Sequence, residues 1–168
     1  MKHATKILDF AMKMELEARD FYLDSLQKVS RPETKSLLEN LAEWERGHYN
    51  YLKKQLDHII DSGRWDTEAG DLSETEGKGI IEGLSRGSVA SPSPGELSSD
   101  FSVLRMAMAL ETDFRTFYSR AAEKTSNAGG KRILLMLADW EGGHQEMIEE
   151  QYKSLQEEFR SEMGFEPF

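Results

Sequence analysis

The stretch that decides the fold is LAEWERGH at residues 41–48, which returns as LADWEGGH at residues 137–144. Each copy ends in the pattern E-x-x-H, formed by Glu45 and His48, then by Glu141 and His144. Residues three apart on an α-helix lie on the same side, one turn apart, so each pair can act on the same neighbour. The sequence therefore predicts two helices that present the same two polar side chains.

The repeat extends well beyond these two octapeptides. Residues 7–57 align with residues 103–153 without an insertion, at a constant offset of 96 positions. A further glutamate lies thirty residues before each E-x-x-H pattern, Glu15 in the first copy and Glu111 in the second. Self-similarity at a fixed offset indicates one supersecondary unit used twice. Two copies favour a pseudo-twofold pair of units rather than a solenoid, which would need three or more.

Apolar residues recur at intervals of three and four in four segments, which is the periodicity of amphipathic helices. The expected helices span residues 5–29, 33–60, 99–125 and 131–160. Thr5 is the expected N-cap of the first helix. Short breaks predict two antiparallel hairpins, at about residues 5–60 and 99–160. The predicted fold class is all-α, an antiparallel four-helix bundle made of two duplicated helical hairpins.

The long crossover between the hairpins, at about residues 61–98, differs in composition from the rest of the chain. It holds seven of the thirteen glycines and is expected to be mostly irregular. A brief helical turn is expected around residues 80–84. Two parallel helices in the middle of a bundle need a connection that runs its full length, about 36 Å for a helix of 24 residues. A crossover of this size can cover that distance with slack.

Length and composition suit a single soluble domain spanning residues 1–168, long enough to bury a core. The net charge of −10 argues against nucleic acid and anionic membranes as partners. No stretch approaches the ~18 apolar residues of a membrane span. Cysteine is absent, which excludes disulfides and thiolate metal sites from these residues. Without the apolar region of a signal peptide, the expected location is cytoplasmic.

Each apolar stripe is interrupted by a glutamate, and a buried carboxylate is costly unless something compensates its charge. Two divalent cations would neutralise four such carboxylates. The candidate ligands, through which any catalysis would run, are Glu15, Glu45, His48, Glu111, Glu141 and His144. This oxygen and nitrogen set suits two ions of iron or manganese, and zinc also binds such sites but does no redox chemistry. Glu45 and Glu141 are expected to bridge the ions, because their helices also supply the histidines.

Two tyrosines recur with the upstream glutamates. Tyr22 and Tyr118 lie two helical turns beyond Glu15 and Glu111, on the same face. Their hydroxyls can donate hydrogen bonds to a ligand carboxylate and hold its orientation. The alternative is that both rings are simply part of the apolar core.

Two further residue types recur beside the ligands. Trp44 and Trp140 directly precede the ligand glutamates, so they point about 100° away from them on a helix. Both are therefore expected to be packing residues. Gly47 and Gly143 lie inside helices, where glycine costs roughly 1 kcal/mol. Their recurrence predicts that a neighbouring helix approaches closely at these points.

The repeated motifs resemble those of the rubrerythrins, a branch of the ferritin-like di-iron carboxylate proteins. The resemblance covers roughly residues 5–155 apart from the crossover. It rests on E-x-x-A-R-x-x-Y at residues 15–22, on Glu111 with Tyr118, and on the two E-x-x-H patterns. It implies a four-helix bundle with a non-haem di-iron centre, often in a homodimer. The implied activity is reduction of hydrogen peroxide or dioxygen in oxidative-stress defence.

Two features differ from the rubrerythrins. Rubrerythrins usually end in a small domain whose four cysteines hold one iron and feed electrons inward, whereas this sequence has no cysteine. The difference implies an external electron-donor protein. Phe114 stands three residues after Glu111, where rubrerythrins tend to carry an extra glutamate that lets an iron change its ligand.

The sequence leaves three functions open. The first is a di-iron oxidoreductase that reduces peroxide or dioxygen at the expense of Fe(II). The second is iron handling, in which ferroxidase chemistry is coupled to storage. Storage needs a hollow cage, and no clear fifth helix is present. The third is a non-catalytic module with a structural or zinc-filled site that acts as a sensor or adaptor.

Overall fold

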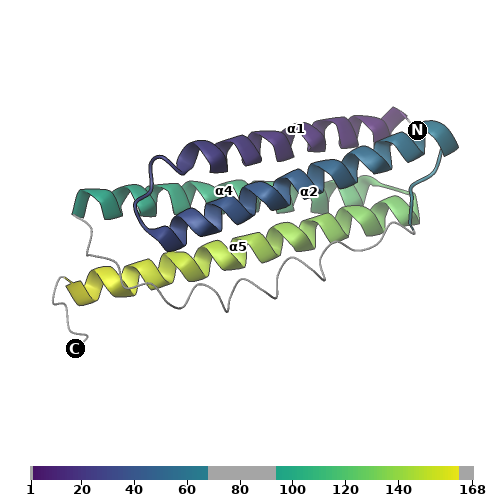
Figure 1. Ribbon diagram of the computed structural model, residues 1–168. Coiled ribbons are helices and arrows are strands. Elements are labelled where there is room, and N and C mark those ends of the chain that lie inside the picture. The colour runs from purple at the N-terminus through teal and green to yellow at the C-terminus, as the bar shows by residue number, and fades with distance from the viewer. Residues whose placement is uncertain (1, 68–93, 163–168) are drawn as a thin grey trace.

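The computed structural model describes residues 2–67 and 94–162. In this part of the chain it contains four long helices and no β-strand. The helices are α1 (Lys2–Ser25), α2 (Pro32–Ser62), α4 (Pro94–Lys124) and α5 (Ala128–Glu162). The prediction of an all-α four-helix bundle is confirmed (Figure 1). None of these helices is both long enough and apolar enough to cross a membrane.

The four helices form two antiparallel hairpins, α1 with α2 and α4 with α5 (Figure 1). The two helices of each hairpin contact each other closely along their length, whereas the hairpins approach each other less closely. Helix α2 ends at the opposite end of the bundle from the start of α4 (Figure 1). The short helical turn expected around residues 80–84 lies outside the described residues.

Helix boundaries differ from the predicted ones by a few residues. Helix α1 begins at Lys2, so Thr5 lies inside the helix and its prediction as the N-cap was wrong. The same helix ends at Ser25 rather than at residue 29, because the chain tightens into a turn in which the Lys28 N–H donates to the Ser25 carbonyl. Helix α4 begins five residues early at Pro94, a residue suited to the first turn of a helix.

The core consists of two apolar clusters, one toward each end of the bundle, with a polar layer between them. The first cluster lies toward the α1–α2 turn and includes Ala18, Leu37, Leu38, Leu41, Leu104 and Leu155, all at most 1% exposed. The second lies toward the α4–α5 turn and includes Leu8, Ala11, Leu52, Ala122, Leu134 and Leu137, all fully buried. Burying each leucine contributes roughly 1.5–3 kcal/mol.

The end of α2 is held against the α4–α5 turn. The Gln55 side chain is buried, donates to the Asp66 carbonyl at 2.9 Å and accepts from the Asp66 N–H at 3.0 Å. Trp65 then packs on Gly130 so closely that a Cβ there would lie 2.5 Å from the indole Nε1. Glycine is required at this position because no other residue leaves room for the ring.

A second link ties the α1–α2 turn to the other hairpin. Asp100 of α4 is fully buried, and its carboxylate accepts hydrogen bonds from the Ser30 N–H at 2.8 Å and the Arg31 N–H at 3.0 Å. These bonds satisfy backbone donors at the start of α2, where the helix itself offers no partner. Together with the Trp65 contact, they link the hairpins at both ends of the bundle.

Candidate metal centre

The polar layer between the two apolar clusters contains all six candidate ligands. We call this group the Glu/His cluster; it consists of Glu15, Glu45, His48, Glu111, Glu141 and His144. Five of the six side chains are fully buried and His144 is 4% exposed. Each helix supplies at least one member, because the apolar stripe that directs each helix face inward carries the glutamate with it.

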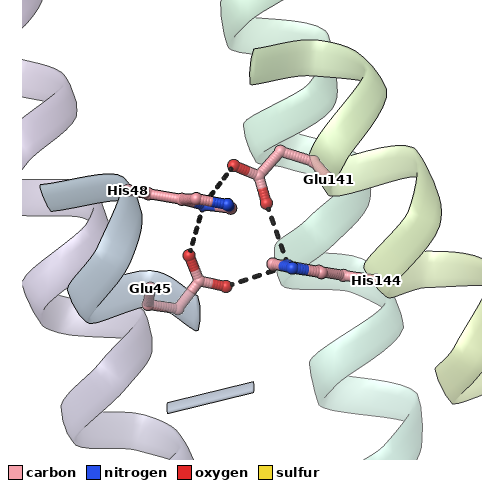
Figure 2. Close-up of side chains that lie close together, drawn as sticks. All are labelled: Glu45, His48, Glu141 and His144. Carbon is pink, nitrogen blue, oxygen red and sulfur yellow. Dashed lines mark hydrogen bonds and ion pairs between the residues drawn. The ribbon is translucent and has the colours of Figure 1, made fainter. Parts of the chain in front are cut away.

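Four members of the cluster form a ring of alternating carboxylates and imidazoles (Figure 2). His48 Nδ1 lies 3.1 Å from a Glu45 oxygen and 3.4 Å from a Glu141 oxygen. His144 Nδ1 lies 3.2 Å and 3.4 Å from the other oxygens of the same two carboxylates. One ligand atom from each of the four lies within 4.8 Å of the others, so the group could hold a metal ion.

The two remaining glutamates divide the cluster into two half-sites. Glu15 lies 3.6 Å from His48 Nδ1, and Glu111 lies 3.5 Å from His144 Nδ1. Each histidine is thus paired with one such glutamate, while Glu45 and Glu141 offer one oxygen to each histidine. We call Glu15 with His48 half-site 1, and Glu111 with His144 half-site 2.

Both tyrosines bind the outer glutamates, as we call Glu15 and Glu111 to distinguish them from the inner glutamates Glu45 and Glu141. Each of these hydrogen bonds joins the two hairpins. The Tyr22 hydroxyl donates to Glu111 Oε1, and the Tyr118 hydroxyl donates to Glu15 Oε1. Both rings are fully buried, so packing and hydrogen bonding occur together. The hydrogen bonds leave the second oxygen of each glutamate facing the histidine of its half-site.

The two tryptophans contact the histidines of the opposite hairpin. Trp44 stacks on His144 with ring centroids 5.1 Å apart, and Trp140 stacks on His48 at 4.9 Å. The prediction that the tryptophans are packing residues omitted this partner. Each tryptophan directly precedes a ligand glutamate and does point away from that glutamate's face of the helix. It points instead at the neighbouring helix, which carries the histidine of the opposite hairpin. Recurrence of tryptophan at the same place in both copies was the available signal.

The sequence predicted that a neighbouring helix approaches closely at Gly47 and Gly143, and for Gly143 this prediction is wrong. A Cβ at Gly143 would meet nothing within 4 Å, because this part of α5 faces open space. The neighbouring Gly142 is more restricted, since a Cβ there would lie 3.3 Å from the guanidinium carbon of Arg115. The close approach that does require glycine is the one between Gly130 and Trp65.

Burial and neighbouring charge favour protonation of the outer glutamates. Burial raises the pKa of Glu15 well above 4.5, and the charges of Glu141 and Glu45 raise it further. Burial also raises the pKa of Glu111, with the Glu45 charge as the next cause. Both carboxyls can remain protonated because a second negative charge would not be solvated in this layer.

The inner glutamates and the histidines show the opposite balance. Burial opposes ionisation of Glu45, but the His144 and His48 charges lower its pKa. Burial likewise opposes a charged imidazole, yet the pKa of His48 is raised, chiefly by Glu141, and that of His144 chiefly by Glu111. The pKa of Glu141 is lowered by His48 and His144, against its burial and the charge of Glu45. In the metal-free cluster these pKa shifts favour charged imidazoles at His48 and His144 beside ionised Glu45 and Glu141.

With these protonation states the cluster carries no net charge, and metal ions could take the place of the bound protons without changing that. Two protonated histidines, two ionised glutamates and two protonated glutamates sum to zero charge. Two divalent cations with four ionised glutamates and two neutral histidines also sum to zero. Exchanging four protons for two metal ions therefore leaves the buried layer neutral, which avoids the cost of an uncompensated charge.

The donor atoms also fit a metal because many of them lack a hydrogen-bond partner. Glu15 Oε2, Glu45 Oε1, Glu111 Oε2, Glu141 Oε1, Glu141 Oε2 and His144 Nδ1 each lie 3.2–3.6 Å from an oppositely charged atom of the cluster. Among the described residues, however, none of these atoms makes a hydrogen bond. Buried polar atoms in folded proteins normally have a partner. These atoms line the interior of the cluster, and their combination of oxygen and nitrogen donors suits iron or manganese.

Comparison with known proteins agrees with this architecture. Residues 3–154, which include the whole Glu/His cluster, match the model of a family described as a ferritin-like domain. No curated protein matches the chain. Among solved structures, the chain is similar to a hypothetical protein from Pyrococcus furiosus, with 25% sequence identity and a TM-score of 0.64. That similarity covers 92% of this chain and 90% of the other.

Proposed function

The chain belongs to the family of ferritin-like domains, and we propose from this premise that its Glu/His cluster holds two iron ions. We further propose that the protein is a rubrerythrin-like oxidoreductase that reduces hydrogen peroxide or dioxygen with electrons from Fe(II). The observation that carries this proposal is the sharing of carboxylates. Glu45 and Glu141 each direct one oxygen to His48 and the other oxygen to His144, which is the arrangement that two adjacent ions need.

The two half-sites indicate how the residues would be distributed. Glu15 and His48 would hold one ion, Glu111 and His144 the other, and the two shared glutamates would bridge them. Iron bound there would supply the electrons for breaking an O–O bond and a place for the oxygen species to bind. Manganese or zinc fits the same donor atoms, but zinc supplies no electrons.

The tyrosines would keep the outer glutamates in position for binding. Burial raises the pKa of Tyr22 and of Tyr118 well above 10, so both hydroxyls keep their protons and remain donors. Each donates to the carboxylate of the other hairpin and directs its second oxygen toward the centre. Residues that orient a ligand in this way generally affect metal affinity nearly as much as the ligands do.

The surroundings of the cluster favour a small substrate. The apolar clusters lie on both sides of the polar layer, and none of its six side chains is more than 4% exposed. Phe114 is 5% exposed and stands where rubrerythrins tend to carry an extra glutamate. A peroxide or dioxygen molecule suits so closed a site better than a large organic substrate does. These 168 residues contain no cysteine, so we propose a separate protein as the electron donor.

The test is an anaerobic titration with Fe(II), followed by a pulse of hydrogen peroxide. We expect two Fe(II) per chain and loss of one peroxide for every two Fe(II) oxidised, faster than with free Fe(II). Growth of the bound iron far beyond two per chain under air would instead favour iron handling. Failure to bind Fe(II), with tight binding of zinc, would contradict the oxidoreductase and favour a non-catalytic module.

A further inference from the structure

Four aromatic rings form one continuous stack through the Glu/His cluster. In order they are Trp44, His144, His48 and Trp140, with consecutive centroid distances of 5.1, 5.1 and 4.9 Å. The planes differ by 18°, 8° and 18°. Each half-site therefore has an indole in face contact with its histidine, and the two indoles terminate the stack.

The indoles at the ends of the stack are easily oxidised, a property that apolar packing does not require. A leucine would fill the space beside an imidazole, whereas indole is among the side chains that lose an electron most easily. Trp44 and Trp140 are 6% and 8% exposed, so their rings are largely shielded from water. The third tryptophan, Trp65, packs on Gly130 at one end of the bundle and provides a comparison within the same chain.

We propose that Trp44 and Trp140 are one-electron donors to the centre, so that the chain itself supplies two of the four electrons that convert dioxygen to water. This inference rests on the proposed function, because it needs iron in the cluster. Each indole serves the half-site whose histidine it contacts. Electron transfer slows steeply with distance, so rings in direct contact form the shortest route from an indole to a ligand.

The electrons and atoms balance as follows. Conversion of one dioxygen to two waters breaks the O–O bond and takes up four electrons and four protons. Two Fe(II) that become Fe(III) supply two electrons. Each indole loses one electron and its N–H proton, which supplies the other two electrons and two of the protons, while solvent supplies the remaining two protons. A one-electron reductant then restores each indole with an electron and a proton.

Without the indoles the same centre has only two electrons to give. Dioxygen would then stop at hydrogen peroxide, formed with two electrons and two protons from solvent. Electron donation by the two indoles, which we call the relay, therefore predicts water in place of hydrogen peroxide as the product, and also a tryptophan radical. If the two tryptophans were purely structural, replacing them would change neither the product of dioxygen reduction nor the radical signal.

The experiment uses the full chain loaded anaerobically with two Fe(II) and mixed with dioxygen in the absence of a reductant. Freeze-quench EPR detects radicals, and indole-deuterated tryptophan identifies them. A peroxide assay gives the hydrogen peroxide released per dioxygen consumed. The variants are Trp44→Phe, Trp140→Phe and the double variant, with Trp65→Phe as the matched control. Phenylalanine keeps a ring in the stack but is much harder to oxidise.

We expect a tryptophan radical and little peroxide from the wild type and from Trp65→Phe. The double variant should bind the same iron, show no tryptophan radical and release clearly more peroxide per dioxygen than the wild type, up to one where dioxygen is in excess over the diferrous centres; each single variant should lose part of the radical signal. Fe(II) oxidation in the wild type with no tryptophan radical, and with the same peroxide yield in the double variant, would overturn the relay and leave the proposed function standing. Absence of Fe(II) oxidation in every protein would overturn both.

Discussion

Tyr118 donates a hydrogen bond to Glu15, which lies 103 positions earlier in the chain and in the other hairpin. The reciprocal bond runs from Tyr22 to Glu111. Each half-site is therefore completed by a residue from the opposite hairpin. The cluster cannot form in one hairpin alone, so we expect metal binding and association of the hairpins to depend on each other.

Removing the Tyr118 hydroxyl should weaken both metal binding and folding. Tyr118→Phe leaves Glu15 Oε1 buried without its donor, at a cost of about 1–3 kcal/mol in the free energy of unfolding. Metal affinity should fall by roughly 10–100-fold because the carboxylate loses its orientation. Urea denaturation of the metal-free protein and competition with a chelator measure the two effects. Tyr152→Phe is the control, since Tyr152 is only partly buried and contacts Phe101; equal effects of the two substitutions would contradict the prediction.

Glu45 should be much more important for metal binding than Glu43, an exposed glutamate on the same helix. Glu45→Ala removes one oxygen from each half-site, so metal content after dialysis should fall well below two per chain. The metal-free protein should also lose roughly 3–5 kcal/mol of stability, because two buried imidazolium ions lose a partner. Glu43→Ala is the control: Glu43 is exposed on the same helix and pairs with Arg46 on the surface. Retention of two metal ions by Glu45→Ala would exclude a bridging role.

Metal binding should release about four protons per chain at neutral pH. The pKa values of Glu15, Glu111, His48 and His144 are all raised in the metal-free protein, so these groups carry protons that a metal must displace. Calorimetric titration in buffers of different ionisation enthalpy counts the released protons. A release near zero would mean that the cluster is already deprotonated.

The same shifts predict how stability depends on pH. A group whose pKa is raised in the folded state stabilises the fold fully at a pH below its unfolded pKa, which is near 4.5 for a glutamate and 6.5 for a histidine. This stabilisation is lost as the pH rises through the pKa of the folded state. The metal-free protein should therefore lose stability above neutral pH. It should also lose stability in acid, where Glu45 and Glu141, whose pKa values are lowered, become protonated.

Metal removes the alkaline loss because the bound ligands are already deprotonated. The difference in Tm between the metal-loaded and metal-free protein should consequently grow with pH. Thermal scans from mildly acidic to mildly alkaline pH measure it. A difference that shrinks as the pH rises would contradict the assigned protonation states.

Two glycines in α5 should respond oppositely to alanine. Gly130→Ala places a methyl group 2.5 Å from the Trp65 Nε1, which must displace the ring and should cost about 1–3 kcal/mol. Gly143→Ala meets nothing within 4 Å and should raise the free energy of unfolding by up to about 1 kcal/mol, since alanine favours a helix interior. Urea denaturation of the metal-free proteins compares them. Destabilisation by Gly143→Ala would show that this glycine has a contact of its own.

The helices were predictable because their apolar periodicity is a local property. The predicted boundaries erred where local signals were weak: Thr5 lies within α1, and α4 begins at Pro94. The pairing of Trp65 with Gly130 could not be predicted, because it joins the segment after α2 to the first turn of α5. No periodicity in either segment encodes such a contact.

For the site, the sequence by itself determined which six side chains belong together, since a repeat with fixed spacing places three of them at equivalent points of each copy. Only the tertiary structure decided which side chains touch. The tyrosines bind the glutamates of the opposite hairpin, and the tryptophans stack on its histidines. The physical reason is that spacing along a helix sets the direction of a side chain, whereas its partner depends on how neighbouring helices are rotated and shifted against each other.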